Sequence, residues 1–371
     1  MRGGSSSGAA SSTVRARPSR HAAASAPSSS IFVALRVRPM SRTDEAMSER
    51  AVEVMDSSRA AAVDGSNKNE ILLREDPSNA WRPQGQRVRR PVDRQYAYDV
   101  VFGPEASNEE VHARTTSTLL DSVFQGYNAC CFAYGATGAG KTHTILGTPS
   151  TDGCAALALK QMFARIKSEK LESVKVLVSM VEIYQERIRD LLLNGRGERQ
   201  PGEVVPSTER ATAAQLRRRN NRSRANGLDL REDPIRGPTV AGATVLQVDS
   251  ADRVIELLVH GNANRTTEPT GANLTSSRSH AVLSVFVSSG RQFSKFTLID
   301  LAGNERAAAT SNRGARFKEG ASINRSLLAL GNCINALVKR DRQQRAGRGG
   351  AKVHVPFRDS KVRLRVHAVV T

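Results

Sequence analysis

The 371-residue sequence is poor in aromatic residues, cysteines and acidic residues. Aromatic side chains make up only 4% of it, which argues against stacking of single-stranded nucleic acid on aromatic rings as a main function. The cysteines show neither metal-ligand spacing nor a disulfide framework, so we expect small buried side chains in a reducing compartment. There are four of them: Cys130, Cys131, Cys154 and Cys333.

Long apolar runs are also absent. No stretch approaches the ~18 residues of a membrane-spanning helix, so we expect no membrane span. Acidic residues number 36 against 55 lysines and arginines, which gives a net charge of +19. This charge attracts polyanions and leaves three candidate partners: nucleic acid, an anionic membrane and an acidic protein surface. A generally basic protein with solvated arms is the simpler alternative.

Composition divides the chain into a tail and a domain. Residues 1–30 are rich in Ser, Ala, Gly and Arg and contain no acidic residue, so they are predicted to be disordered. An organellar transit peptide has the same composition. The apolar content of 39% supports one large domain, which we place at residues 31–361. Within it, the Arg-rich residues 195–226 are predicted to form a disordered insertion.

Apolar segments of strand length alternate with helix-like segments. Helical periodicity marks residues 108–124 and 322–338, and a short helix is expected through Thr144. The polar stretch up to about Gln95 shows no clear pattern. The alternation predicts an α/β fold whose sheet is covered by helices on both faces. The predicted strands are residues 31–37, 129–134, 174–184, 281–287 and 293–301.

A glycine-rich loop, GATGAGKT at residues 135–142, follows a predicted strand and opens a predicted helix. It matches the phosphate-binding pattern G-x-x-x-x-G-K-[ST], in which backbone N–H groups close around phosphates. Lys141 is expected to neutralise the β- and γ-phosphates, and Thr142 to offer its hydroxyl to Mg²⁺. The predicted phosphate-binding residues are Gly135, Ala136, Thr137, Gly138, Ala139, Gly140, Lys141 and Thr142.

A second segment adds a carboxylate. The strand at 293–301 ends in Asp300, which is placed to hold the Mg²⁺ shell, and the backbone amide of Gly303 can sense a γ-phosphate. Standing alone, such an aspartate would be interpreted as a helix cap. NKNE at residues 67–70 resembles a guanine-reading motif, but it precedes the phosphate loop, so we expect adenine.

A third segment, NLTSSRSH at residues 273–280, places two hydroxyls side by side. Ser276 and Ser277 can serve Mg²⁺ and the attacking water. Arg278 can pair with a carboxylate, and Glu305 is its natural partner. Standing alone, this segment would be interpreted as a polar loop with N-capping serines.

Together the three segments resemble the kinesin superfamily in order and spacing. GATGAGKT with His143 is similar to the kinesin phosphate loop, NLTSSRSH to its switch I, and DLAGNE at 300–305 to its switch II. RVRP, from Arg36 to Pro39, resembles the segment that flanks adenine, which implies that these two residues contact the base. The similarity runs from about residue 31 to 361. It implies a P-loop NTPase-like motor fold, ATP hydrolysis with Mg²⁺, and a place on cytoplasmic microtubules.

Within the superfamily the sequence is most similar to the kinesin-8 class. ASNEEV at 106–111 and RGARFKEGASINRSLLALGNCINAL at 313–337 support this class. Asn304 departs from the more usual serine and resembles the microtubule-depolymerising kinesin-13 class. Movement along microtubules and destabilisation of microtubule ends are therefore both expected activities.

The expected mechanism relies on positioning and charge, because phosphoryl transfer needs little covalent help. Lys141 and Mg²⁺, the latter held by Thr142 and Ser277 with Asp300 in the outer shell, would stabilise the developing charge. Ser276 and the backbone near Gly303 would place the attacking water. The proton would leave through water toward Arg278 and Glu305, a pair that the resemblance implies is a latch closing on triphosphate.

The microtubule contact is expected in the basic run between Lys339 and Lys361 and in the helix before it, which resemble the tubulin-binding elements of kinesins. A second contact is expected at residues 87–90. We therefore attribute the net positive charge to microtubule binding, and we expect no nucleic-acid partner. The cations predicted to face acidic tubulin tails are Arg342, Arg345, Arg348 and Lys352.

The resemblance stops after Lys361. Residues 362–371 depart from the family pattern, so we expect a truncated or divergent motor end. Two alternatives therefore remain at this point. One is a non-motile microtubule-binding protein, and the other is a nucleic-acid-dependent P-loop ATPase.

Overall fold

The structure is a computed structural model, and it describes only part of the chain. The described residues are 31–41, 52–55, 69–73, 93–193, 227–233, 237–266, 277–290, 292–304, 315–345, 353–356 and 360. The predictions for residues 1–30, 87–90, 195–226 and 362–371 lie outside these ranges and stay predictions.

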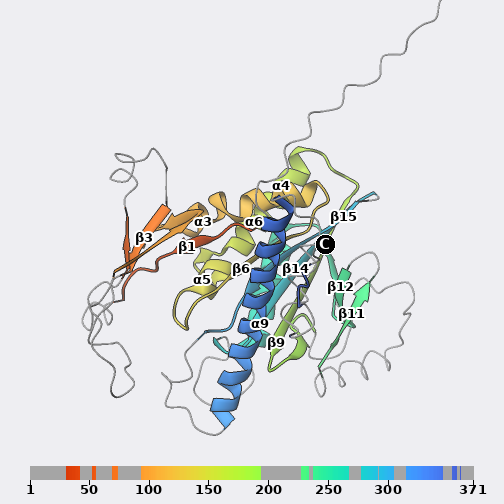
Figure 1. Ribbon diagram of the computed structural model, residues 1–371. Helices are drawn as coiled ribbons and strands as arrows, with labels where there is room; N and C mark the ends of the chain where they lie inside the picture. Colours follow the sequence, from red (N-terminus) through yellow and green to blue (C-terminus); the bar gives the residue numbers. More distant parts are fainter. Residues whose placement is uncertain are drawn as a thin grey trace, which may run out of the picture.

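A six-stranded mixed sheet forms the centre of the fold (Figure 1). β14 (His280–Ser289) pairs antiparallel with β9 (Val174–Tyr184) and with β15 (Gln292–Asp300), and β15 pairs parallel with β6 (Ala129–Ala133). The outer edge of β9 holds two short antiparallel strands, β10 (Arg187–Asp190) and β13 (Leu246–Val248). The four apolar strands predicted here are confirmed, and the sheet places the ends of β6 and β15 side by side.

Alternating side chains give this sheet two apolar faces. On one face, residues such as Leu283 and Val285 pack against α4 (Thr116–Phe124), α6 (Cys154–Ser168) and α8 (Ala251–Thr266). On the other face, Val282 and Ile299 pack against α9 (Ala315–Arg345), the long helix that crosses the front of Figure 1. The prediction of a sheet covered by helices on both faces is confirmed.

The helix predicted at 108–124 is two helices. α3 (Asn108–Arg114) and α4 are separated by Thr115, whose backbone lies at φ −129°, ψ −80°. The Thr115 hydroxyl donates to the carbonyl of Val111, a local bond that competes with helix continuation. Ser107 caps α3 by accepting a hydrogen bond from the Glu110 amide at 3.2 Å.

Smaller sheets surround the centre. β1 (Ala34–Arg36) pairs parallel with β5 (Val100–Phe102), which confirms the first predicted strand in shortened form. The stretch without a clear pattern contains an antiparallel sheet of β2 (Val52–Val54), β3 (Asn69–Leu73) and β4 (Arg94–Tyr98). Its residues are mostly exposed or half-buried, so no apolar alternation marks them. The remaining hairpins are β7 (Gly147–Thr148) with β8 (Thr151–Asp152), and β11 (Asp229–Asp233) with β12 (Gly237–Ala241).

Helix α9 is longer than the helix predicted at 322–338. It extends through Arg345, so Arg342 and Arg345 lie on a helix that continues beyond the sheet, rather than in a loop. Arg348 and Lys352 lie outside the described residues. No helix in the described ranges is long and apolar enough to cross a membrane.

Candidate nucleotide site

The glycine-rich loop connects β6 to the short helix α5 (Lys141–Ile145), as predicted. Gly138 and Gly140 have φ angles of +76° and +89°, a left-handed backbone that favours glycine. A Cβ atom on either residue would meet no atom within 4 Å. The backbone conformation, and not crowding, therefore requires glycine here, and the space over the loop is open.

Lys141 begins α5 and folds back over the loop. Its ammonium donates to the carbonyl oxygens of Gly135 at 3.0 Å and Ala136 at 2.9 Å. The next residue, Thr142, donates its hydroxyl to Oδ2 of Asp300 at 2.8 Å. The loop threonine and the strand-end aspartate, which are 158 positions apart, are thus in direct contact.

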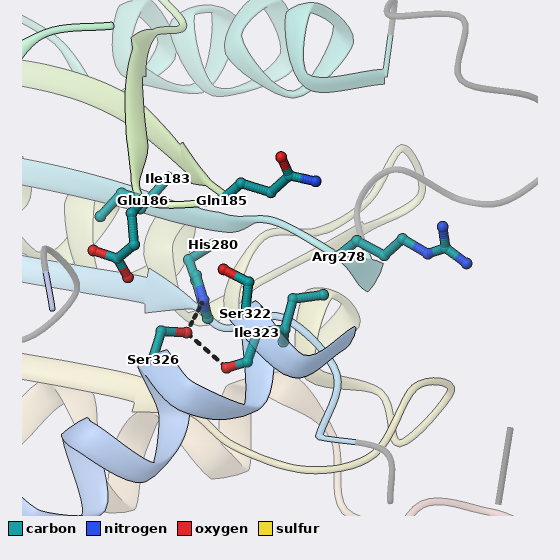
Figure 2. A pocket seen from close by; sticks show the side chains of 8 residues that line it. All are labelled: Ile183, Gln185, Glu186, Arg278, His280, Ser322, Ile323 and Ser326. Carbon is teal, nitrogen blue, oxygen red and sulfur yellow. Dashed lines mark hydrogen bonds between the residues drawn. The ribbon is translucent and has the colours of Figure 1, made fainter. Parts of the chain in front are cut away.

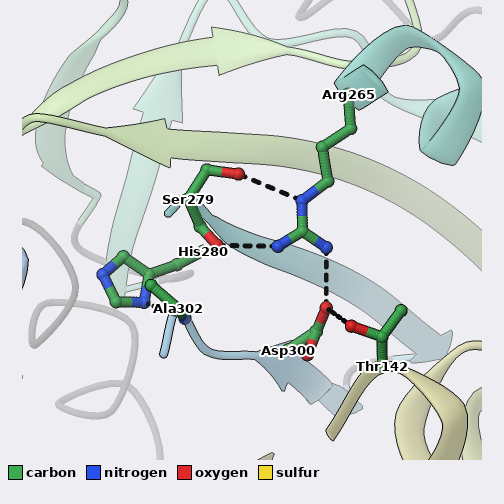
Figure 3. A network of polar contacts seen from close by, with 6 residues as sticks. All are labelled: Thr142, Arg265, Ser279, His280, Asp300 and Ala302. Atoms are coloured by element: carbon green, nitrogen blue, oxygen red, sulfur yellow. Dashed lines mark hydrogen bonds and ion pairs between the residues drawn. The ribbon is translucent and has the colours of Figure 1, made fainter. Parts of the chain in front are cut away.

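Asp300 also forms an ion pair that is fully buried (Figure 3). Nη1 of Arg265, near the end of α8, lies 2.6 Å from the same Oδ2. The guanidinium further donates to the hydroxyl of Ser279 at 3.1 Å and to its carbonyl at 2.6 Å. Both charged side chains have a relative exposure of 0%, so each depends on the other for its stability in the interior.

The second carboxylate oxygen of Asp300 takes no part in the bonds to Arg265 and Thr142. Oδ1 of Asp300 is buried and has no hydrogen-bond partner among the described residues. Those residues also include no cluster of three His, Cys, Asp or Glu side chains that could enclose a metal ion. Mg²⁺ is a hard cation that usually keeps several water and phosphate ligands, so it needs only one or two oxygen ligands from the protein. The Thr142 hydroxyl and the Asp300 carboxylate provide such oxygens. The residues therefore fit Mg²⁺.

Arg265 was not among the residues predicted for the site. A signal exists in the sequence, because Arg265 continues the buried stripe of Val254, Leu258 and Gly261 on α8. A charged residue at a position where the helical period requires an apolar one indicates a buried ionic partner. The identity of that partner depends on the tertiary fold.

The chain that leaves β15 contacts two other predicted segments. The Gly303 amide donates to the Ser277 carbonyl at 2.7 Å, and the Asn304 amide donates to the Gly135 carbonyl at 3.3 Å. The side-chain amide of Asn304 also donates to the hydroxyl of Tyr134. Because the Gly303 amide is bonded to Ser277, it must leave that carbonyl before it can bind a γ-phosphate.

Ser276 and Glu305 lie outside the described residues, so their predicted roles stay predictions. The same holds for the latch between Arg278 and Glu305. Arg278 itself lies beside α9, at the cleft shown in Figure 2. The structure therefore brings Thr142 to Asp300 and Ser277 to Gly303.

Arg36 joins three elements beneath the loop. Its guanidinium donates to the Asn108 side chain at 2.6 Å, to the Thr144 hydroxyl at 2.9 Å and to the Ala106 carbonyl at 2.8 Å. Burial lowers the pKa of Arg36 from its usual value. These contacts connect β1 to α3 and α5, so Arg36 supports the loop, and its contact with adenine stays a prediction.

Pro39 and the side chain of His143 are exposed. The His143 carbonyl accepts a hydrogen bond from the Asn108 side chain at 3.0 Å, which fixes the backbone of α5. Their contact with nucleotide stays a prediction.

His280, the first residue of β14, lies beside Ala302 (Figure 3). Its Nδ1 accepts a hydrogen bond from the Ala302 amide at 3.0 Å, and its Nε2 lies 3.2 Å from the Ser326 hydroxyl on α9. Burial, aided by the positive charges of Arg265 and Lys141, lowers the pKa of His280 to about 3. The imidazole is therefore neutral at physiological pH.

A glycine-rich loop between a strand and a helix, with a strand-end aspartate bonded to the loop threonine, defines a P-loop nucleotide-binding protein. Within that class, the chain belongs to the kinesin family, because the family model described as the kinesin motor domain matches residues 36–364. The resemblance inferred from the sequence is thereby confirmed.

Curated relatives of the kinesin-8 class are among the matches, in agreement with the predicted class. Kinesin-like protein KIN-8B of Arabidopsis thaliana is 38% identical, covering 93% of this chain and 37% of that protein. Kinesin-like protein KIF18B of Gallus gallus is 42% identical, covering 77% of this chain and 32% of that protein. The chain thus spans less than half of the length of these relatives.

Solved structures show the same fold. A KIF14 motor with ADP, in complex with a microtubule, superposes with a TM-score of 0.66 at 29% identity, covering 91% of this chain and 85% of that one. A KIF14 dimer with AMP-PNP, also in complex with a microtubule, superposes with a TM-score of 0.65 at 31% identity, covering 91% and 84%.

Loss of Arg265 should destabilise the domain strongly. We expect Arg265→Met to lower the free energy of unfolding by ~3–5 kcal/mol, because Asp300 remains buried without its cation. Adding Asp300→Asn should recover part of this loss. The control Arg253→Met removes an exposed ion pair with Glu256 on the same helix and should cost less than about 1 kcal/mol. Urea unfolding measures all three, and equal losses for Arg265→Met and Arg253→Met would contradict the buried-pair interpretation.

The buried neutral His280 should make the protein less stable in mild acid. An unfolded histidine has a pKa near 6.5, whereas that of folded His280 is about 3. Between these values the unfolded state binds a proton that the folded state does not, so stability falls as the pH drops. From pH 7 to pH 5 this amounts to about 2 kcal/mol. In urea unfolding at both pH values, His280→Asn should lose that much less than the wild type, and an equal loss would exclude the effect.

Proposed function

We propose that this chain is a microtubule-stimulated ATPase that couples ATP hydrolysis to movement along microtubules or to destabilisation of their ends. The observation that carries the proposal is the contact of Thr142 with Asp300, whose second oxygen is buried and has no partner among the described residues. Membership of the kinesin family supports the coupling to microtubules.

The residues that would hold the nucleotide follow from the site. The loop glycines would present backbone amides to the phosphates, and Lys141 would exchange its loop carbonyls for phosphate oxygens. Thr142, Ser277 and Asp300 would hold Mg²⁺, which neutralises phosphate charge when it is bound. Ser276 and the Gly303 amide would position the attacking water, and Glu305, paired with Arg278, would accept the proton through water.

Adenine is favoured over guanine as the base. Arg36 and Pro39 stand at the end of β1, the segment that resembles the adenine-flanking segment of kinesins. The KIF14 structures contain ADP and AMP-PNP, which supports the same choice of base here.

Helix α9 offers the surface for the track. Its residues Ile323, Leu327 and Leu330 pack on the sheet, so the opposite side of the helix faces solvent. That exposed side carries three cations and one apolar residue, spaced three and four positions apart. We define it as the outer stripe: Arg325, Leu328, Asn332, Asn335, Lys339 and Arg342. A cationic helical face of this length is complementary to an acidic filament, and the net charge of +19 would strengthen the attraction over longer range.

The first test is ATP turnover by the purified chain with and without microtubules. We expect turnover to rise at least about tenfold with microtubules, and Lys141→Ala to abolish nucleotide binding because the phosphates lose their main cation. A folded chain that hydrolyses ATP without stimulation would instead support the non-motile alternative. Stimulation by DNA and not by microtubules would favour the nucleic-acid-dependent ATPase.

The second test concerns the outer stripe. Reversing two of its charges, with Lys339→Glu and Arg342→Glu, should weaken microtubule affinity about tenfold or more and leave basal turnover unchanged, since both residues are remote from the phosphate loop. The control Lys167→Glu with Lys175→Glu makes the same charge change on exposed positions of α6 and β9. Co-sedimentation over a range of salt concentrations measures the affinity. If both double variants weaken binding equally, net charge and not the stripe is responsible.

A further inference from the structure

We propose that His280 is a positioning residue that mechanically joins the nucleotide site to helix α9, through hydrogen bonds to the Ala302 main chain on one side and to Ser326 on the other. The inference rests on the proposed function, since it explains how a change at the phosphate loop reaches the helix that would bind the track.

The hydrogen bonds have only one consistent direction. The amide of Ala302 can only donate, so Nδ1 of His280 is the acceptor, at 3.0 Å. The neutral ring then carries its proton on Nε2 and donates it to the Ser326 hydroxyl, at 3.2 Å. That hydroxyl in turn donates to the Ile323 carbonyl at 2.7 Å. A chain of three bonds thus runs from the strand exit to the backbone of α9.

A protonated imidazole could not make this connection. It has no acceptor nitrogen, so the bond from Ala302 would be lost. The ring is buried, with a relative exposure of 3%, and Arg265 and Lys141 are the nearby positive charges. The ring therefore stays neutral and works as a permanent connection, not as a pH switch.

The connection begins at the segment that a γ-phosphate would move and ends on α9, the helix that would bind the microtubule. Ala302 precedes Gly303, whose amide is bonded to Ser277 and must leave that carbonyl to reach a γ-phosphate. When Gly303 moves, the adjacent Ala302 amide moves with it. The backbone of His280 is fixed by its pairing with Ile183 of β9, so the side chain is the part that can turn. A shift of the Ala302 amide therefore turns the His280 side chain about its fixed backbone, and the ring carries this change to Ser326.

Beside this connection lies a small cleft. A cleft with a volume of about 10 Å³, close to the least space that holds one water molecule, separates the turn after β9 from the helix (Figure 2). Gln185 and Glu186 line one side of the cleft, and Ser322 and Ser326 line the other. His280 and Ser326 both line this cleft, and the hydrogen bond between them is a specific restraint on where the helix lies.

The apolar contacts of Ile323, Leu327 and Leu330 with the sheet also hold α9. Such contacts are non-directional and tolerate small sliding movements, whereas a hydrogen bond weakens steeply when its geometry changes. A purely packing role for His280 would therefore affect stability alone. A positioning role would also change how α9 responds to nucleotide.

The experiment uses four variants of the full chain. Ser326→Ala removes the bond at α9, Ser326→Thr restores a hydroxyl, and His280→Asn keeps an acceptor for Ala302 but cannot reach Ser326. The control Thr297→Val removes a buried hydroxyl on β15 that has no hydrogen-bond partner among the described residues. Hydrogen–deuterium exchange of α9 is compared between ADP and AMP-PNP, and turnover is measured with and without microtubules.

We expect AMP-PNP to change exchange in α9 of the wild type, the control and Ser326→Thr. In Ser326→Ala and His280→Asn this change should shrink about three- to tenfold, as loss of one buried hydrogen bond predicts, while the phosphate loop is still protected by nucleotide. The ratio of stimulated to basal turnover should fall by a similar factor, with the KM for ATP nearly unchanged.

An undiminished exchange response of α9 in both variants, or no response in the wild type, would overturn the inference. A loss of thermal stability without a change in either ratio would also overturn it, since that result indicates packing alone. Failure of the proposed function looks different. In that case the wild type shows no microtubule stimulation, and the exchange measurement, which needs no microtubules, still decides the role of His280.

Discussion

The buried ion pair between Arg265 and Asp300 is the interaction on which the nucleotide site depends. Removing two charges from water costs several kcal/mol for each, and that cost is offset only when the charges meet and their other polar atoms are bonded. Ser279 accepts two hydrogen bonds from the guanidinium, and Thr142 donates to the same carboxylate oxygen that binds Arg265. Since these residues come from α8, the turn just before β14, β15 and α5, these four parts of the chain must keep one mutual arrangement for the pair to exist.

Asp300 is also a boundary between a fixed and a movable part of the chain. Before it, β15 is bonded to β14 and β6 on its two edges. After it, successive amides bind separate partners: Ala302 binds His280, Gly303 binds Ser277, and Asn304 binds Gly135. A ligand that takes one of these amides therefore rearranges the segment after the strand and leaves the carboxylate in place. Under the proposed function, this segment would be the two-state element whose equilibrium a phosphate biases.

The sequence was sufficient for the parts of the site that local patterns encode. The loop at 135–142, its contact with Asp300 and four of the six strands of the central sheet could be predicted, because they carry a short motif or a clear apolar run. The short strands β10 and β13 of this sheet were not predicted. Arg265 could not be paired with Asp300, since that contact depends on where α8 ends over the sheet. β2, β3 and β4 were missed because exposed strands carry no apolar alternation, and the break at Thr115 was missed because it depends on one backbone conformation.

The length of α9 explains how a small change beside the nucleotide site could matter at the far end of the helix. Ser326 is the hydrogen-bond partner of His280. Arg342 lies 16 positions further along the same uninterrupted helix, which is about 24 Å at 1.5 Å per residue. A tilt of about 5° around Ser326 therefore moves Arg342 by about 2 Å. The contacts of Ile323, Leu327 and Leu330 with the sheet, and those of Cys333 and Leu337 with Val355, limit how far such a tilt can go. Under the proposed connection, the hydrogen bond at Ser326 is one of the contacts that set the angle at which the outer stripe is presented.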